Sequence, residues 1–404
     1  MSAGRHHASP GSHASHGPWA LFRLITAHVC LHSAMAGMRM AAPLFALREG
    51  YSALSVGVLL ALFSLAQVFL AIPAGRFADR HGLRRPIGLS VVIASTGAAV
   101  SVAFPSFEAL CFSAMCLGGA TGVSAIALQR HVGRAAADAL ELKRVFSWLS
   151  IGPAVSNFLG PVAVGVLIDH AGFRAAFLLT ALLPLLAWWW VRQAQELPPA
   201  PAAQGGARAQ VWSLLKDATM RRLLIVNWLL SSCWDVHTFV VPVLGHERDF
   251  SASVIGTILG SFAVAAACVR VALPLLAHHL REWVVVSAAM VATALLFGIY
   301  PLMESPWTMG LCSVLLGAVL GTVQPMIMST LHQITPHALH GQAIALRLMS
   351  INLSSVLMPM LFGTAGAVVG VSVVFWTVGA MVGLGSRTAF NLRPKQAVAP
   401  VDHA

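Results

Sequence analysis

The stretch Gly75-Arg76-Phe77-Ala78-Asp79-Arg80-His81-Gly82-Leu83-Arg84-Arg85 lies between two long apolar runs. It carries four Arg and one Asp, and a Gly stands at its start and another before its last basic residues. A charged segment between two runs that are each long enough to cross a bilayer is typical of a short loop between membrane helices. This stretch therefore indicates a membrane protein and fixes one edge of its membrane region.

The apolar runs continue along the whole chain of 404 residues. The chain is 57% hydrophobic and only 10% charged, with a mean hydropathy of +0.78, whereas a soluble domain has about 25% charged residues. We count twelve runs that could each span a bilayer. They lie near 21–46, 55–74, 86–104, 107–129, 145–168, 173–191, 222–245, 254–277, 283–303, 306–331, 345–369 and 371–386.

The charged loop resembles the segment between helices 2 and 3 of the major facilitator superfamily, written G-x-L-a-D-r-x-G-r-k. The matching residues are Gly75, Asp79, Arg80, Gly82 and Arg84, and Leu83 departs from the family's Arg or Lys. The resemblance implies an all-α integral membrane protein with the MFS fold, that is, 12 transmembrane helices in two pseudo-symmetric six-helix bundles. It also implies a transporter that works by alternating access.

An internal repeat supports two similar halves independently of the loop. At a spacing of about 198 residues, 156–165 aligns with 354–363 and 55–63 aligns with 254–262. A Pro- and Gly-rich stretch between the halves reads as a linker. The predicted domains are a disordered, cytoplasmic, His-rich tail (1–18), an N-terminal bundle (19–192), a cytoplasmic central loop (193–220), a C-terminal bundle (221–387) and a cytoplasmic tail (388–404).

The distribution of basic residues predicts how the chain is oriented. If the N-terminus is cytoplasmic, most of the 25 Lys and Arg residues lie on the cytoplasmic side, Arg347 at the start of the eleventh run among them. Cytoplasmic loops are enriched in Lys and Arg. We therefore expect a multi-pass protein of the bacterial plasma (inner) membrane with both termini in the cytoplasm. Basic residues spread over so many loops also make nucleic acid an unexpected partner.

Within the family, the Asp of the charged loop helps to hold the cytoplasmic side closed in the outward-open state. The resemblance gives that gating role to Asp79, with Arg130 at the end of the fourth run as a partner and the start of helix 11 as a positive dipole end. The alternative is that the loop's charges only orient the chain. A substitution of Asp79 should then leave transport unchanged.

The fifth run carries a Gly- and Pro-rich pattern that includes Gly160, Pro161 and Gly165. It resembles the G-x-x-x-G-P-x-x-G-G signature of family exporters of the antiporter type, although Ser156 and Val164 replace two of its glycines. The resemblance implies proton-coupled export, and ordinary packing of a Gly-rich helix is the alternative. The Arg that the family places in helix 4 is absent, since Ala114 occupies its position.

Asp235 is the one acidic residue that we place deep inside a span, and an ionisable residue there is a candidate for function. Asn227, Ser231 and Asp235 follow at intervals of four and share one helical face. Because helices 1, 4, 7 and 10 line the central cavity in this family, the resemblance implies that Asp235 faces the cavity and carries protons. The alternative is a structural ion pair with Arg270 or nearby His237.

The first span places His28, His32 and Arg39 on one face. Together with Arg270, Arg39 gives the expected cavity more positive than negative character, and Arg binds carboxylate or phosphate well. We therefore expect an anionic or zwitterionic solute, with Gln324 as a further hydrogen-bonding residue. Alternatively, Arg39 lies near the outer end of its helix and reaches the interface.

The sequence thus favours a secondary active transporter that exports a small organic solute in exchange for protons. Two alternatives stay open: proton-coupled uptake of an organic anion, and export of a divalent metal bound by His28, His32, Asp235 and His237. The chain lacks H-E-x-x-H, G-x-S-x-G and a phosphate-binding Gly loop. We therefore expect no enzyme activity and no cofactor. The expected partners are the solute, protons and the lipid bilayer, and the protein is expected to be a monomer.

Overall fold

The computed structural model describes residues 18–135, 139–196, 214–276, 281–335 and 340–392. Within these residues the chain forms helices and no strand. The helices are α1 (Pro18–Arg48), α2 (Ala53–His81), α3 (Arg84–Ala103), α4 (Phe107–Ala135), α5 (Ala139–Val191), α7 (Ala218–Glu247), α8 (Ala252–Leu276), α9 (Glu282–Ile299), η2 (Tyr300–Leu302), α10 (Pro306–Ile334), α11 (His340–Val369) and α12 (Val371–Phe390). Almost all of the predicted His-rich tail, and most of the predicted central loop and C-terminal tail, lie outside the described residues.

The twelve predicted spans are confirmed. They correspond to eleven helices, because one long helix, α5, contains two of the spans. Eleven of the described helices are long and apolar enough to cross a membrane. The longest, α5, turns at Gly172, where φ is +80°, and so carries the runs predicted at 145–168 and 173–191. The last two spans separate at Gly370, where φ is +86°. Glycine adopts such positive φ angles without steric cost, which explains both breaks.

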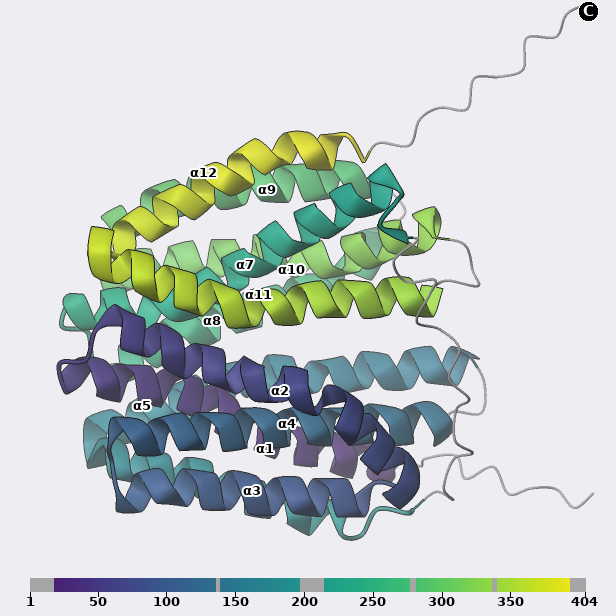
Figure 1. Ribbon diagram of the computed structural model, residues 1–404, viewed down its shortest axis with the longest axis vertical. Coiled ribbons are helices and arrows are strands. Elements are labelled where there is room, and N and C mark those ends of the chain that lie inside the picture. The colour runs from purple at the N-terminus through teal and green to yellow at the C-terminus, as the bar shows by residue number, and fades with distance from the viewer. Residues whose placement is uncertain (1–17, 136–138, 197–213, 277–280, 336–339, 393–404) are drawn as a thin grey trace, which may run out of the picture.

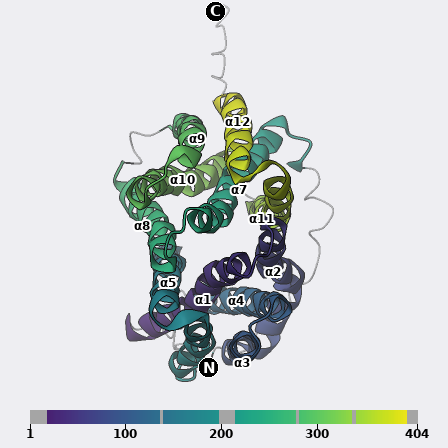
Figure 2. The ribbon, with the colours of Figure 1, turned by 90° about the vertical axis from the view of Figure 1, so that its left-hand side faces the viewer.

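The helices form two bundles, α1–α5 and α7–α12, which lie one above the other in Figure 1 and again in the end-on view of Figure 2. One end of the molecule carries the turns at 49–52, Gly172, 249–251 and Gly370, and we call it the turn face. The other end carries the loop between α2 and α3, the end of α5 and the starts of α7 and α11, and we call it the linker face. In Figure 1 the turn face is on the left.

Two pseudo-equivalent helix crossings join the bundles near the turn face. A Cβ atom at Gly57 of α2 would collide with the carbonyl oxygen of Pro359 in α11. The equivalent glycine of the other half, Gly256 of α8, faces the carbonyl oxygen of Pro161 in α5 in the same way. Small residues allow this close backbone approach between membrane helices.

The same crossings contain a second matched pair of glycines. Gly363 of α11 lies against the carbonyl oxygen of Ala53, and Gly165 of α5 lies against that of Ala252. The repeat seen in the sequence is therefore present as two related interfaces. Figure 1 shows α2 and α11 together at the turn face and apart toward the linker face.

The outer surface of both bundles is apolar, as expected for contact with lipid. Large side chains such as Phe69, Leu295, Leu311 and Leu384 are more than half exposed. In water such an extended apolar surface would favour association, whereas in a bilayer it is the ordinary exterior of a membrane helix. The structure thus fits a multi-pass membrane protein.

Candidate functional site

A cavity of about 630 Å³ lies between the two bundles, a size typical of sites for small molecules. Five helices line it, and α5 is the only one of the N-terminal bundle. The lining residues are Pro153, Ala154 and Asn157 of α5, Leu230, Ser231, Trp234 and Asp235 of α7, Ala263 and Arg270 of α8, Leu320, Val323, Gln324, Pro325 and Met328 of α10, and Ile351 and Ser355 of α11. The wall is thus mostly apolar, with a few polar groups and one side chain of each charge.

Asp235 lies in the wall of this cavity and is 5% exposed. Its carboxylate accepts hydrogen bonds from the hydroxyl of Ser355, at 3.3 Å to each oxygen, and from that of Ser354 at 3.5 Å. Among the described residues no ion pair joins Asp235 to Arg270 or His237. The buried carboxylate is therefore held by hydroxyl groups and has no cation bound directly to it.

The predicted face of α7 divides between two environments. The helix begins at Ala218, where the Asp217 side chain caps it by accepting from the backbone N–H of Thr219 at 2.8 Å. Ser231 and Asp235 line the cavity. Asn227, two turns before Asp235, does not line it and accepts a hydrogen bond from Nε of Arg347 at 3.1 Å.

Arg347, which the sequence assigns to the cytoplasmic side, lies in the first turns of α11, toward the linker face. It is only 5% exposed. Arg347 therefore packs against α7 inside the C-terminal bundle.

Arg270 of α8 lines the cavity and packs against an aromatic ring. Its guanidinium carbon lies 5.6 Å from the centre of the Trp234 ring. Its Nε is buried and has no hydrogen-bond partner in the described part of the chain. An unpaired buried donor is costly, so this group is available to a ligand.

Arg39 of α1 lines a second, small cavity of about 40 Å³. Asn157 and Trp234 line both cavities, so the two are neighbours. The Nε and Nη2 atoms of Arg39 are buried and lack partners within the described residues. Arg39 thus points into the protein and not to the outer interface.

The predicted histidines do not line the large cavity that contains Asp235. His237 lines the small cavity, stacks on Phe262 at 4.2 Å and shares a 2.9 Å hydrogen bond with the hydroxyl of Ser313, which also bonds to Tyr300 at 2.7 Å. The rings of His28 and His32 lie 5.7 Å apart and line neither cavity. Within the described ranges, no group of three His, Cys, Asp or Glu could hold a metal.

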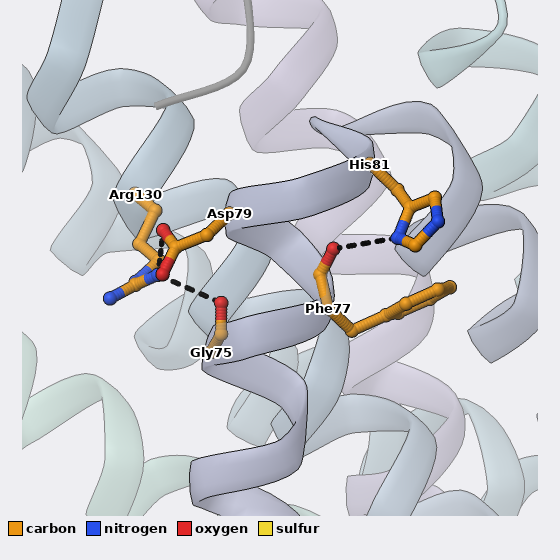
Figure 3. Close-up of polar contacts among 5 residues, drawn as sticks. All are labelled: Gly75, Phe77, Asp79, His81 and Arg130. Carbon is orange, nitrogen blue, oxygen red and sulfur yellow. Dashed lines mark hydrogen bonds and ion pairs between the residues drawn. The ribbon is translucent and has the colours of Figure 1, made fainter. Parts of the chain in front are cut away.

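The charged stretch predicted as a loop is mostly helical, because α2 continues to His81 and α3 begins at Arg84. It forms a local network at the linker end of α2. Asp79 and Arg130 form an ion pair, and Nη1 of Arg130 donates to the carbonyl oxygen of Gly75 at 2.8 Å (Figure 3). A Cβ atom at Gly75 would lie 3.8 Å from the guanidinium carbon of Arg130, so the glycine leaves room for it. Arg80, in contrast, is exposed.

Glu196, just after α5, completes this network and was not predicted. Its carboxylate accepts from the backbone N–H groups of Leu83, at 3.0 Å, and Arg84, at 2.6 Å, and so caps the start of α3. The Arg84 side chain donates back to the carbonyl oxygen of Ala194 at 2.9 Å. Gly82, with φ +73°, is the residue against which the carboxylate packs.

A second unpredicted carboxylate joins the two bundles at the turn face. Asp169 of α5 accepts from the backbone N–H groups of Ala252, at 2.9 Å, and Ser253, at 2.8 Å. These are the first two residues of α8. The sequence gives one signal: an acidic residue just before the Gly172 turn.

Comparison with protein families places this arrangement in a known group. The model of the Major Facilitator Superfamily matches residues 24–343 and, in a second match, residues 223–403. Together these matches cover most of the chain.

Named relatives and solved structures agree with this match. The chain is 26% identical over 355 residues to a multidrug resistance protein MdtG of Salmonella typhimurium, covering 82% of this chain and 84% of the relative. It is 28% identical over 374 residues to that of Enterobacter lignolyticus, covering 87% and 86%. The fold is similar to a POT family transporter in complex with 5-aminolevulinic acid (TM-score 0.78, 14% identity, covering 94% and 99%). It is also similar to an inward-facing bacterial homolog of the human lysosomal transporter Spinster (TM-score 0.75, 15% identity, covering 96% and 100%).

Proposed function

The chain belongs to the Major Facilitator Superfamily, and we propose that it exports a small organic solute across the bacterial inner membrane in exchange for protons. The family match makes it a membrane transporter. The names of the relatives, multidrug resistance proteins, support the direction of export. The protein would act as a monomer with both termini in the cytoplasm.

The position of Asp235 carries this proposal. Among the described residues it is the only carboxylate that is buried, and it lies in the wall of the cavity between the bundles. The hydroxyls of Ser354 and Ser355 hold it without neutralising it. A proton or a solute group can therefore occupy the carboxylate, but not both, and this competition is what exchange requires.

The surroundings of Asp235 set the conditions for that competition. The other charged or titratable side chains near it are Arg39 of α1, Arg270 of α8, and Cys233 and His237 of α7. The facing helices α5, α10 and α11 contribute the uncharged Asn157, Gln324, Ser354 and Ser355. In this role Asp235 would carry the proton, and the polar neighbours would orient the solute.

Alternating access follows from the two ends of the molecule. The glycine crossings close the turn face, and the cavity residues of α8 lie further along the helix, toward the linker face. With the basic residues of α2 on the cytoplasmic side, as we propose, the cavity would be reached from the cytoplasm in this state. The Asp79–Arg130 ion pair is formed in this state. When the linker face closes, Asp79 would interact with the positive dipole end at the start of α11.

The glycine and proline residues of α5 have a place in this cycle. Gly165 and the carbonyl of Pro161 form one crossing with α8, and a Cβ atom at Gly160 would press on α1 at 2.9 Å from the Gly37 nitrogen. Pro161 and Gly165 would thus form part of a surface on which the halves rock, whereas Gly160 packs within the N-terminal bundle. Ordinary packing predicts the same contacts, so only transport distinguishes the two interpretations.

Flux measurements in proteoliposomes test the proposal. A pH gradient should drive accumulation of at least one solute of a panel of organic anions, zwitterions and lipophilic cations, in the direction opposite to the protons. Asp235→Asn should abolish this accumulation and retain exchange of labelled for unlabelled solute. Glu304→Gln, which changes an exposed carboxylate, is the matched control.

Three results would contradict the proposal. Movement of solute and protons in the same direction would support the uptake of an organic anion instead. Flux of a divalent metal alone would support the metal alternative. Wild-type accumulation by Asp235→Asn would remove the proton-carrying role from this residue.

A further inference from the structure

We propose that the cavity binds a zwitterion, a solute with a cationic amine and an anionic acid group, and that Asp235 binds the amine while Arg270 binds the acid. This inference rests on the proposed function, because it names the substrate class of the same site. It differs from a general preference for anions in giving each charge of the solute its own partner.

The two charged residues line one cavity without neutralising each other. The carboxylate of Asp235 is bound only by serine hydroxyls, and no ion pair joins it to Arg270 within the described residues. The guanidinium of Arg270 has a buried Nε without a partner and lies near the ring of Trp234. Each side chain thus keeps unused hydrogen-bonding capacity, which a ligand of opposite charge can take up.

Arg39 makes a purely cationic solute a poor fit. Its guanidinium attracts Asp235 electrostatically and lies in the small neighbouring cavity with two unpartnered nitrogens. The region therefore holds two guanidinium groups and one carboxylate. A simple cation would meet this excess of positive charge with nothing to bind Arg270.

A purely anionic solute does not fit exchange with protons. When Asp235 is ionised, it repels an anion and partly neutralises the guanidiniums, whereas protonation of Asp235 would favour the anion. Proton and anion would then bind together, and by linkage they would move together. The amine of a zwitterion, in contrast, replaces the proton on Asp235 and so couples binding to proton release.

The remaining wall suits a solute with an apolar body between its two charged ends. Trp234 lies next to Asp235 in sequence and close to Arg270 in space, so it provides an aromatic surface near both charged residues. Leu320, Val323 and Met328 of α10 provide an apolar surface in the same cavity. Gln324 adds both a donor and an acceptor for orientation.

Binding to the purified full-length protein tests this inference with matched ligands. 6-Aminohexanoic acid and an aminoalkylphosphonate are each compared with an N-acetylated form, which keeps only the acid, and an amide or ester form, which keeps only the amine. Affinity is read from ligand-dependent thermal stabilisation. We expect at least one scaffold to bind about tenfold more tightly as the zwitterion than in either blocked form, because each blocked form loses one charged contact.

Two variants assign the two charges. Arg270→Gln should reduce affinity for the zwitterion and the acid-only form by about tenfold and should not weaken binding of the amine-only form. Asp235→Asn should reduce affinity for the zwitterion and the amine-only form by about tenfold and should not weaken binding of the acid-only form. Arg222→Gln, an exposed residue of the same α7, should change none of these affinities.

The inference is overturned if no zwitterion binds, or if a blocked form binds as well as its parent. The pH-driven flux described above separates this failure from that of the proposed function. Exchange of a lipophilic cation or an anion for protons, without binding of any zwitterion, would retain proton-coupled export and reject the substrate class. Absence of pH-driven flux for the whole panel would reject the proposed function itself.

Discussion

Asp169 in the N-terminal bundle accepts a 2.8 Å hydrogen bond from the backbone N–H of Ser253 at the start of α8, in the C-terminal bundle. Its other carboxylate oxygen accepts from the N–H of Ala252. A negative charge at a helix N-terminus is stabilised by the unpaired N–H groups and the helix dipole. The pseudo-equivalent position of the other half is Ala367, so only one of the two crossings has this bond. We infer that Asp169 helps to hold the turn face closed.

Asp169→Ala should therefore shift the protein toward states with an open turn face. The side chain is exposed, so we take about 1 kcal/mol for the lost charge-assisted bonds, which is about a fivefold change in the ratio of states. Spin labels at Glu49→Cys and Val368→Cys, on a background without native cysteines, would report the distance between the bundles. Glu304→Ala is the control on the same face, and an unchanged distance distribution in Asp169→Ala would refute the role.

Gly57→Ala should disturb the same face by a different route. A Cβ atom there would collide with the Pro359 carbonyl, whereas one at Gly310 in α10 would meet nothing within 4 Å. We expect Gly57→Ala to push α2 from α11 and to lower the transport rate several-fold, and Gly310→Ala to leave transport unchanged. Equal transport by the two variants would show that the close crossing is not needed.

Gly82→Ala should lower the melting temperature more than Gly50→Ala does. Both glycines have positive φ, +73° and +84°, so both variants carry a similar backbone cost of about 1 kcal/mol. Only at Gly82 would the new methyl group displace the Glu196 carboxylate from the start of α3. Adding Glu196→Ala to Gly82→Ala should cost less than Glu196→Ala alone. Purely additive changes in melting temperature would argue against the contact.

Asp79→Asn should slow transport without preventing expression, because it removes the ion pair with Arg130 that we place in the closing of the linker face. Arg130→Gln should have a similar effect, and the double variant should be little worse than either single one. Arg85→Gln, an exposed change in the same loop, is the control. If Asp79→Asn transports at the wild-type rate, the charges of this stretch would serve only to orient the chain in the membrane.

The sequence predicts much of this fold because membrane helices leave a strong one-dimensional signal. Long apolar runs mark the spans, and the breaks at Gly172 and Gly370 fall where the sequence placed them. The repeat likewise predicts matched crossings, since glycine and proline recur at corresponding positions. Helix ends are predicted less well, because polar residues can continue a helix beyond its apolar run. For example, α2 continues to His81, although its run ends near residue 74.

The site is predicted less completely, for a geometric reason. Periodicity places Asn227, Ser231 and Asp235 on one face but does not say how far along the helix the cavity extends, so Asn227 faces Arg347 instead. Contacts between distant segments are harder still. Glu196 and Asp169 each cap a helix that starts far away in the chain, and no local pattern links a carboxylate to such a helix start.

The most direct test of the central claim is the number of protons released when a solute binds. Purified protein in weakly buffered detergent solution, carrying a pH indicator, is mixed with a solute that the binding experiments have identified. At a pH low enough for Asp235 to be protonated before the solute binds, we expect release of about one proton per bound solute in the wild type and in Glu304→Gln, and none in Asp235→Asn, because the solute displaces the proton from that carboxylate. Binding without proton release in the wild type, or equal release by Asp235→Asn, would contradict exchange at Asp235.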